Sequence, residues 1–328
     1  MRPFTYERAA DVASAIAAAV DGEAGAVRYL GGGTNLVDLM RLNVERPQHL
    51  VDVSRLPDDL VEESPHGGLR VGAAARNSDL AAHPLVRERY PVLAQALLNG
   101  ASGQLRNLAT VGGNLLQRTR CPYFQDVTKP CNKRRPGSGC PARAGDHRNL
   151  AILGHSDACV ATHPSDMAVA MTALGADVHV EGPGGRRTIP MPGLHRLPGD
   201  EPQRDTVLEP GELICAVTLA PPLPGGRSRY RKVRERASFA FALVSVAADV
   251  AVADGAVRDC RLAFGGVAPA PWRGERAEAA LRGSPATTES FTRAADAELQ
   301  AARPLRDNGY KVTLLRRILV QTLTELCA

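Results

Sequence analysis

The chain has 328 residues, of which 44% are hydrophobic and 23% are charged, and its formal net charge is +5. These values are typical of a globular protein of about two domains and give no domain-wide basic face. Aromatic residues make up only 4%, too few for the stacking surfaces of a protein that binds single-stranded nucleic acid.

The first patterned segment, Ala9–Val20, is rich in alanine and is predicted to form an amphipathic surface helix. It is too short to cross a bilayer, and it lacks the basic region and cleavage site of a signal peptide. We therefore expect no export signal in the chain itself. It would be cytoplasmic, or periplasmic if exported already folded on a partner that bears a signal.

Short strand-like and helix-like runs alternate along the N-terminal third. Residues 27–32 and 49–53 are predicted to be buried strands, with a helix over 35–42 between them. A further strand is expected within 67–75, and a helix over 91–102.

Two glycine loops, GGGTNL (31–36) and ATVGGNL (109–115), interrupt these elements. Glycine allows positive φ and close approach of the backbone, so successive N–H groups of such loops can surround a phosphate. A diphosphate would suit two loops of this kind. Neither contains G-x-G-x-x-G or G-K-[ST], so the Rossmann fingerprint and the P-loop are missing. Either loop alone is also compatible with a plain tight turn.

Residues 117–158 break the alternation, because they are rich in Arg, Lys, Pro, Gly and Cys and show little periodicity. Such a long irregular stretch is improbable inside a compact domain unless something else orders it. Four cysteines fall within 39 residues here, with the spacing C-x9-C-x8-C-x18-C: Cys121, Cys131, Cys140 and Cys159.

The odd total of seven cysteines argues against a disulfide framework. Three lie far from the group of four, in apolar surroundings, and are predicted to be ordinary core thiols: Cys215, Cys260 and Cys327.

Regular patterns resume with a helix and a strand over 165–180, and a Pro/Gly cluster at 221–226 is predicted to be a domain boundary. Beyond it, two alternating strands flank Asp254–Gly255, a dipeptide suited to a type I′ hairpin turn. Helices are expected at 275–282, 288–302 and 310–327. The last hundred or so residues are therefore predicted to be an α+β unit.

Four motifs together carry a resemblance: GGGTNLVDLM, ATVGGNL, HPSDMAVAMTALGA and RYRKVRERASFAFALVSVA. They resemble the FAD-binding medium subunit of the xanthine dehydrogenase family, and most of all the flavin subunits of bacterial molybdenum aldehyde oxidoreductases. The resemblance implies an α+β fold with a two-lobed FAD-binding domain of the p-cresol methylhydroxylase type over 1–224. A smaller α+β C-terminal flavoprotein domain would follow over 225–328, and the cysteine-rich segment 117–160 would be an iron–sulfur insertion.

The resemblance also implies which residues hold FAD. The glycine loops would bind its diphosphate, Ser165 and Asp166 would approach its ribose or phosphates, and Ile214 and Lys232 would contact the flavin ring. The full set of expected contacts is Gly31, Gly32, Gly33, Thr34, Asn35, Leu36, Thr110, Gly112, Gly113, Asn114, Ser165, Asp166, Ile214 and Lys232.

The four grouped cysteines are predicted to bind a 4Fe–4S cluster, which takes four thiolates. Such a site has a charge of about −2 and is costly to bury without cations or N–H dipoles. Eight basic residues of the segment are expected to compensate this charge: Arg118, Arg120, Lys129, Lys133, Arg134, Arg135, Arg143 and Arg148. Between Arg118 and Arg148 there are only two acids, Asp126 and Asp146.

Other interpretations of the cysteines remain open. Structural zinc is one, although its usual C-x2-4-C pairs are missing. Disulfides, free thiols and a basic address or nucleic-acid patch at 133–135 are others. His147, His155 and His163 also lie in the segment, and hydrogen-bonded or surface roles are expected for them.

The predicted function is that of the flavin subunit of a molybdenum-containing aldehyde (or related hydroxylating) oxidoreductase. Electrons would pass from partner iron–sulfur clusters to FAD and then to an external acceptor. The chain has neither the cysteine patterns of 2Fe–2S clusters nor the length for a molybdenum domain, so a small 2Fe–2S subunit and a large molybdenum-cofactor subunit are expected partners. No acid–base catalytic residue is predicted. The alternative is a metal- or cluster-containing nucleic-acid-binding protein that uses the basic cysteine-rich loop.

Overall fold

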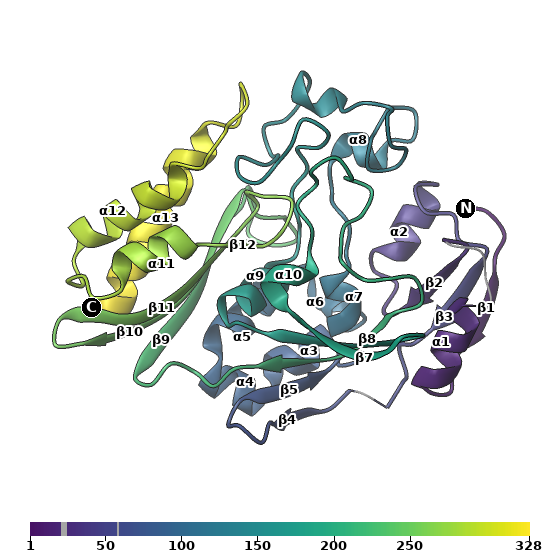
Figure 1. Ribbon diagram of the computed structural model, residues 1–328, viewed down its shortest axis with the longest axis horizontal. Coiled ribbons are helices and arrows are strands. Elements are labelled where there is room, and N and C mark those ends of the chain that lie inside the picture. Colours follow the sequence, from purple (N-terminus) through teal and green to yellow (C-terminus); the bar gives the residue numbers. More distant parts are fainter. Residues whose placement is uncertain (21–24, 58) are drawn as a thin grey trace.

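Three β-sheets and the helices around them build the molecule (Figure 1). The structure is a computed structural model that describes residues 1–20, 25–57 and 59–328. Within these ranges, no helix is long and apolar enough to cross a membrane.

The first sheet is parallel, with the strand order β1-β3-β2. Its strands are β1 (Thr5–Arg8), β2 (Val27–Leu30) and β3 (His49–Asp52), and its helices are α1 (Val12–Val20) and α2 (Leu36–Arg41). The predicted strands at 27–32 and 49–53 and the helices at 9–20 and 35–42 are confirmed with shorter bounds. β1 was not predicted, because its four residues are all exposed and show no apolar alternation.

The second sheet is antiparallel, with the order β4-β5-β8-β6-β7. Its strands are β4 (Val61–Glu63), β5 (Leu69–Gly72), β6 (Asp177–Gly182), β7 (Gly185–Pro190) and β8 (Leu213–Leu219). The chain between β5 and the cysteine-rich segment contains α3 (Asn77–Ala82), α4 (Pro84–Arg89), α5 (Pro91–Asn99), α6 (Gly103–Arg106) and α7 (Val111–Leu115). Later come α9 (Asp166–Ala173) and α10 (Met191–Leu194).

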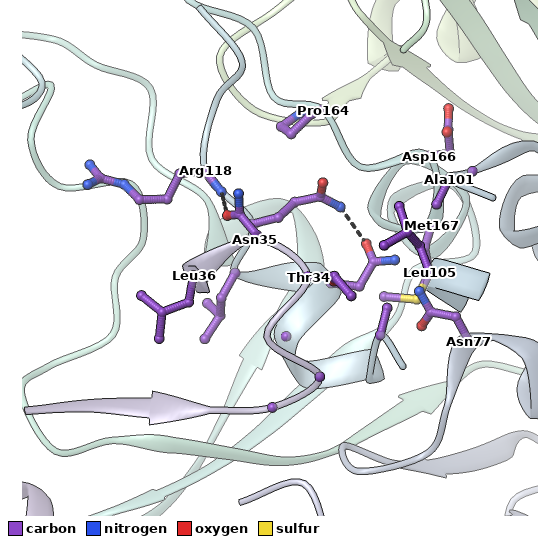
Figure 2. Close-up of a pocket in the computed structure, with 18 of the residues that line it drawn as sticks. Thr34, Asn35, Leu36, Asn77, Ala101, Leu105, Arg118, Pro164, Asp166 and Met167 are labelled. Atoms are coloured by element: carbon purple, nitrogen blue, oxygen red, sulfur yellow. Dashed lines mark hydrogen bonds between the residues drawn. The ribbon is translucent and has the colours of Figure 1, made fainter. Parts of the chain in front are cut away.

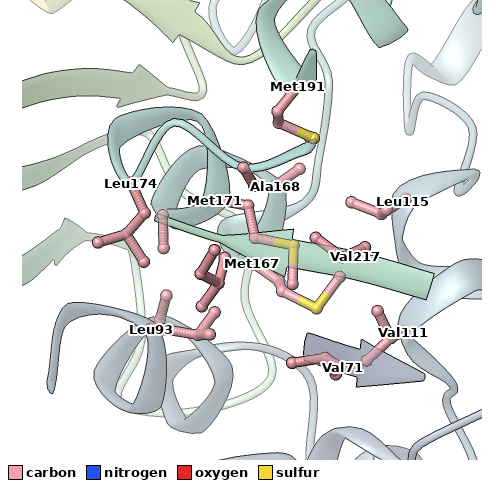
Figure 3. Packing of buried hydrophobic residues seen from close by; sticks show 14 of the residues in the cluster. Val71, Leu93, Val111, Leu115, Met167, Ala168, Met171, Leu174, Met191 and Val217 are labelled. Carbon is pink, nitrogen blue, oxygen red and sulfur yellow. The ribbon is translucent and has the colours of Figure 1, made fainter. Parts of the chain in front are cut away.

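The main core lies between this second sheet and the helices α5 and α9 (Figure 3). Leu93 of α5 and Met167 and Met171 of α9 pack with Val71 of β5 and Val217 of β8. All eight residues of α9 are buried, because α9 also packs against the C-terminal sheet on its other side.

The C-terminal sheet is antiparallel, with the order β12-β11-β10-β9. Its strands are β9 (Gly226–Val233), β10 (Val244–Ala253), β11 (Ala256–Gly265) and β12 (Trp272–Arg273). Helices α11 (Glu275–Leu281), α12 (Thr288–Leu299) and α13 (Tyr310–Cys327) cover one face (Figure 1). The predicted hairpin is confirmed: Asp254 and Gly255 have φ of 53° and 71°, as a type I′ turn requires.

The cysteine-rich segment is irregular, as predicted, with only α8 (Pro122–Gln125) and the 3-10 turn Pro141–Arg143. Its loops lie beside α2 and reach the segment just before α13 (Figure 1). A small core of its own, which includes Phe124, Leu150 and Val160, packs against Leu39 of α2.

Candidate functional site

A cleft of about 1010 Å³ runs between the first sheet, the second sheet with its helices, and the C-terminal sheet. Figure 2 shows Asn35 and Leu36 on one side of it and Asn77, Asp166 and Met167 on the other. All the residues that were predicted to contact FAD line this cleft except Ser165, so the fold brings segments from five parts of the sequence to one place.

The first glycine loop presents a row of backbone donors to the cleft. In the described part of the chain, nothing accepts a hydrogen bond from the backbone N–H groups of Gly32, Gly33, Thr34 and Asn35. Gly33 has φ of 73°, which a residue with a side chain adopts only with strain. Successive free N–H groups of this kind form a concave anion site.

The two glycine loops also pack directly on each other. A Cβ atom on Gly32 would lie 1.9 Å from the carbonyl oxygen of Leu108, and one on Gly31 would lie 2.6 Å from Oγ1 of Thr110. Glycine is therefore needed at these positions for contact between the loops. This packing is a second reason for glycine at position 32, which lines the cleft and is also expected to allow close approach of a ligand.

The second loop differs from the expected phosphate nest, because most of its N–H groups are bonded within the protein. Val111 and Gly112 donate to the carbonyls of Ala75 and Ala73 at 3.0 and 2.9 Å, and Gly113 donates to Oγ1 of Thr110 at 3.2 Å. In the described part of the chain, nothing accepts a hydrogen bond from the backbone N–H of Thr110, so this loop offers a ligand one backbone donor, the hydroxyl of Thr110 and the amide of Asn114.

Three buried side-chain atoms of cleft residues are unpartnered among the described residues. They are Nδ2 of Asn35 and Nε of Arg120, both donors, and Oδ1 of Asn77, an acceptor. Buried polar groups without hydrogen bonds are unfavourable, so these atoms favour a polar ligand in the cleft. Asn77 was missed from the sequence, since it follows β5 without any motif.

Ser165 and Asp166 lie at the N-terminus of α9. Ser165 caps the helix by accepting a hydrogen bond from the N–H of Ala168 at 2.9 Å, and its hydroxyl donates to Oδ1 of Asn114 at 2.5 Å. Oδ2 of Asp166 accepts from Nζ of Lys232 at 2.8 Å, and the side chain of Lys232 is only 1% exposed. Asp166 and Lys232 are thus a buried ion pair at the cleft. Ser165 does not line the cleft itself but orients the amide of Asn114, which does.

The four grouped cysteines line one cavity of about 10 Å³ together with Phe124, Pro130, Ala142 and Ala161. All of them are free thiols. Cys121 also borders the large cleft, so the two cavities are neighbours. Burial raises the pKa of Cys121 to about 12 and raises that of Cys140 and Cys159.

The charges around the cysteines differ from the expected arrangement. Arg118 and Lys133 both bind Asp205, and Arg118 also binds Glu45 at 2.5 Å. Although burial opposes it, these two cations hold the pKa of Asp205 below its usual range. Several of the predicted compensating cations therefore already have acidic partners from elsewhere in the chain. Lys133 still offsets part of the burial effect on the pKa of Cys159.

Other basic residues of the segment also have hydrogen-bond or ion-pair partners. Arg143 pairs with Asp157, Arg148 lies 3.4 Å from Glu235, and Arg134 donates to backbone carbonyls of its own segment. Arg120 differs from these three, since its Nε is buried and, among the described residues, has no hydrogen-bond partner. Its guanidinium lies over the ring of Phe241 at the cleft.

Known proteins with similar sequences show which family this chain belongs to. The family described as the FAD binding domain in molybdopterin dehydrogenase matches residues 2–222, and the CO dehydrogenase flavoprotein C-terminal domain matches residues 228–326. The aldehyde oxidoreductase FAD-binding subunit PaoB of Escherichia coli is 52% identical over 99% of this chain and 98% of its own length. The chain belongs to the FAD-binding medium subunits of the xanthine dehydrogenase family. As such a subunit, it is an FAD-binding part of an oxidoreductase.

Solved structures agree with this family and with the predicted α+β, two-lobed fold. The carbon monoxide dehydrogenase of Hydrogenophaga pseudoflava contains a similar chain, with a TM-score of 0.78 and 26% identity over 99% of this chain and 97% of that one. Quinoline 2-oxidoreductase from Pseudomonas putida shares the fold, with a TM-score of 0.74 at 20% identity. A putative xanthine dehydrogenase FAD-binding subunit of Escherichia coli is 26% identical over 98% of this chain and 93% of its own length.

The alternative of a nucleic-acid-binding protein finds no support in this medium subunit. Lys133 is only 8% exposed and bonds to Asp205 and to the carbonyl of Pro202, and Arg134 wraps around backbone carbonyls. The Lys-Arg-Arg run is therefore not the open basic surface that phosphate backbones require.

The described residues also offer no set of ligands for a single zinc ion. Within residues 1–20, 25–57 and 59–328, no three His, Cys, Asp or Glu side chains converge as ligands of a single metal ion. The histidines of the segment are mostly hydrogen-bonded, as expected: His147 accepts from the N–H of Asp307 at 3.0 Å, and His155 lies 2.7 Å from the carbonyl of Arg303. His163 accepts from the N–H of Ser165 at 3.3 Å and packs against the buried His195, with ring centroids 4.3 Å apart.

Proposed function

We propose that this chain is the flavin subunit of a molybdenum-containing aldehyde oxidoreductase. Electrons from an aldehyde would reach it through 2Fe–2S clusters of a small subunit, after oxidation at a molybdenum cofactor on a large subunit. It would deliver them through bound FAD to an external acceptor. The observation that carries the proposal is the 52% identity with an aldehyde oxidoreductase FAD-binding subunit over nearly the whole of both chains.

The cleft residues fit FAD on features of this structure. The free N–H groups of 32–35 would hold a phosphate, and the amides of Asn35 and Asn114 and the hydroxyl of Thr110 would donate to the diphosphate. Ile214 and Lys232 would lie at the flavin ring, and Asp166 would fix Lys232. FAD, when bound, supplies exchange of single electrons with iron–sulfur centres and of electron pairs with other acceptors.

We further propose that Cys121, Cys131, Cys140 and Cys159 hold a 4Fe–4S cluster. Each of the four irons of such a cluster takes one cysteine, so the thiols need only surround one space rather than converge on a single ion. The cavity that all four cysteines line supports this arrangement. The shared border at Cys121 would put the cluster beside the FAD cleft.

The division of the chain is part of the same proposal. An FAD-binding domain over 1–224, with the iron–sulfur segment 117–160 inserted, would be followed by the C-terminal flavoprotein domain over 225–328. The Pro/Gly cluster at 221–226 separates β8 from β9, and the two family matches end and begin on either side of it.

A dye-reduction assay in three arms tests the proposal. We expect the isolated chain with FAD to reduce no dye when given an aldehyde, because nothing assigned to it activates a carbonyl carbon. The same chain reduced with dithionite should pass electrons to the dye. Addition of the small and large subunits should restore aldehyde-dependent dye reduction, and aldehyde oxidation by the pure isolated chain would overturn the proposal.

A further inference from the structure

The buried helix α9 is held at both ends by the C-terminal sheet. At its C-terminal end, Arg273 of β12 donates to the carbonyls of Thr172 and Ala173 at 2.7 and 2.8 Å. At its N-terminal end, Tyr230 and Lys232 of β9 both bind the carboxylate of Asp166. The position of Asp166 at the cleft is therefore set from the C-terminal sheet.

Each oxygen of the Asp166 carboxylate has its own donor. The hydroxyl of Tyr230 donates to Oδ1, and Nζ of Lys232 donates to Oδ2 at 2.8 Å. Tyr230 is 5% exposed, and burial together with Asp166 raises its pKa well above the usual value, so the hydroxyl stays protonated. With Oδ1 occupied by Tyr230, Oδ2 is left for Lys232.

The ammonium of Lys232 is likewise oriented. It has three N–H donors, of which one goes to Asp166 and another to the carbonyl of Asn99 at 3.0 Å. Lys232 lines the cleft, so its remaining N–H can be directed at a ligand there. The direction of that N–H depends on how firmly Asp166 is fixed, and Tyr230 is the residue that fixes it.

We propose that Tyr230, which lies two residues before the predicted FAD contact Lys232 on β9, is a positioning residue that sets the redox potential of the bound flavin through Asp166 and Lys232. The inference rests on the proposed placement of Lys232 at the flavin ring. Reduced flavin gains electron density, and a nearby ammonium stabilises it, whereas a carboxylate with fewer donors opposes it. Loss of the tyrosine hydroxyl would leave Asp166 less neutralised and Lys232 less well directed.

The test is a spectroelectrochemical titration of the flavin in the full chain with FAD bound. We expect Tyr230→Phe to shift the equilibrium between oxidised and reduced flavin about tenfold toward the oxidised form, a fall of about 30 mV for a two-electron couple. FAD affinity should change by less than about threefold, because the ring contacts of the tyrosine remain. Asp166→Asn should shift the potential in the opposite direction, because it removes the negative charge, and it carries the test if Tyr230→Phe does not fold.

Tyr90→Phe is the matched control. Tyr90 is also buried, and its hydroxyl donates to the carbonyl of Ala220 at 2.9 Å, away from the cleft. We expect Tyr90→Phe to lower stability without moving the potential, and Lys232→Met to lower the potential at least as much as Tyr230→Phe. If Lys232→Met shifts the potential but neither Tyr230→Phe nor Asp166→Asn does, the role of Tyr230 is overturned and the placement of Lys232 at the flavin stands. No shift with Lys232→Met would overturn the placement of Lys232 at the flavin and the inference with it.

Discussion

Oδ1 of Asn35 accepts a hydrogen bond of 2.8 Å from the backbone N–H of Arg118 (Figure 2). This bond joins the first glycine loop to the start of the cysteine-rich segment. It also fixes which way the amide faces, because Oδ1 is occupied and Nδ2 is left buried without a partner among the described residues. A single side chain thus links the two parts of the proposed site.

Replacement of Asn35 by Asp tests the donor directly. The substitution keeps the acceptor for Arg118 but removes the N–H and adds a negative charge, so we expect FAD affinity to fall about tenfold or more. Loss of one hydrogen bond to a buried charged group is worth about 1.5–3 kcal/mol. FAD titration followed by flavin fluorescence measures the effect, with the exposed Asn107→Asp as a control of equal charge. Equal affinities for both variants would contradict the assignment.

The contact between the glycine loops predicts a stability effect in the absence of FAD. Gly32→Ala would push a Cβ atom against the carbonyl of Leu108, so we expect a loss of about 3 kcal/mol in the free energy of unfolding. Gly103→Ala is the control, because a Cβ atom there meets nothing within 4 Å. Urea denaturation of the FAD-free chain compares the two variants. A Gly32→Ala variant as stable as the wild-type chain would show that the loops are not packed this way.

The grouping of the cysteines predicts which variants lose iron. Cys131→Ser and Cys140→Ser, both at partly exposed positions, should lower the iron content of anaerobically reconstituted protein from about four atoms per chain to below about one. Cys327→Ser should retain the full content, because Cys327 packs against the C-terminal core. Iron and sulfide analysis of the three variants and the wild-type chain measures these contents. Full iron in either of the first two variants would exclude that cysteine as a ligand.

Asp249 in β10 predicts a pH dependence of stability. It is 4% exposed, its Oδ2 has no partner among the described residues, and burial raises its pKa to about 6. Arg261 and Arg273 lower the pKa and Asp259 raises it, but burial is the largest effect. In the unfolded chain its pKa is about 3.9, so the folded state keeps a proton that the unfolded state has released between about pH 4 and pH 6.

Stability therefore falls as the pH rises through this window, by up to about 3 kcal/mol. We expect Asp249→Asn to exceed the wild-type chain in the free energy of unfolding by about 2–3 kcal/mol at pH 8. The two should be equal near pH 4. Urea denaturation at both values measures the difference, and the exposed Asp200→Asn should change little at either. A difference that does not vary with pH would contradict the buried carboxylate.

Local patterns in the sequence predicted much of this architecture. The hairpin at Asp254–Gly255, the glycine loop that opens α2 and the irregular cysteine-rich segment all follow from residues close together in the chain. Such features depend on backbone preferences that a short window contains.

Long-range pairing explains what the sequence did not reveal. Asp205 is separated by 87 residues from Arg118 and by 72 from Lys133, so no local pattern marked it as their partner. Two N–H groups of the second glycine loop, those of Val111 and Gly112, donate to the carbonyls of Ala75 and Ala73, which lie far away in the sequence, just after β5. The carboxylate of Asp166 likewise meets Tyr230 only when α9 docks on the C-terminal sheet.

We propose that one chain holds FAD in the cleft and a four-iron cluster at the cysteine cavity beside it. The FAD, iron and sulfide content of the wild-type chain, purified anaerobically and reconstituted with all three, tests both sites at once. We expect about one FAD, four irons and four sulfides per chain, with both flavin and iron–sulfur absorption. A chain that binds about one FAD but retains no iron would contradict the cluster, and a chain that binds iron but no FAD would contradict the cleft.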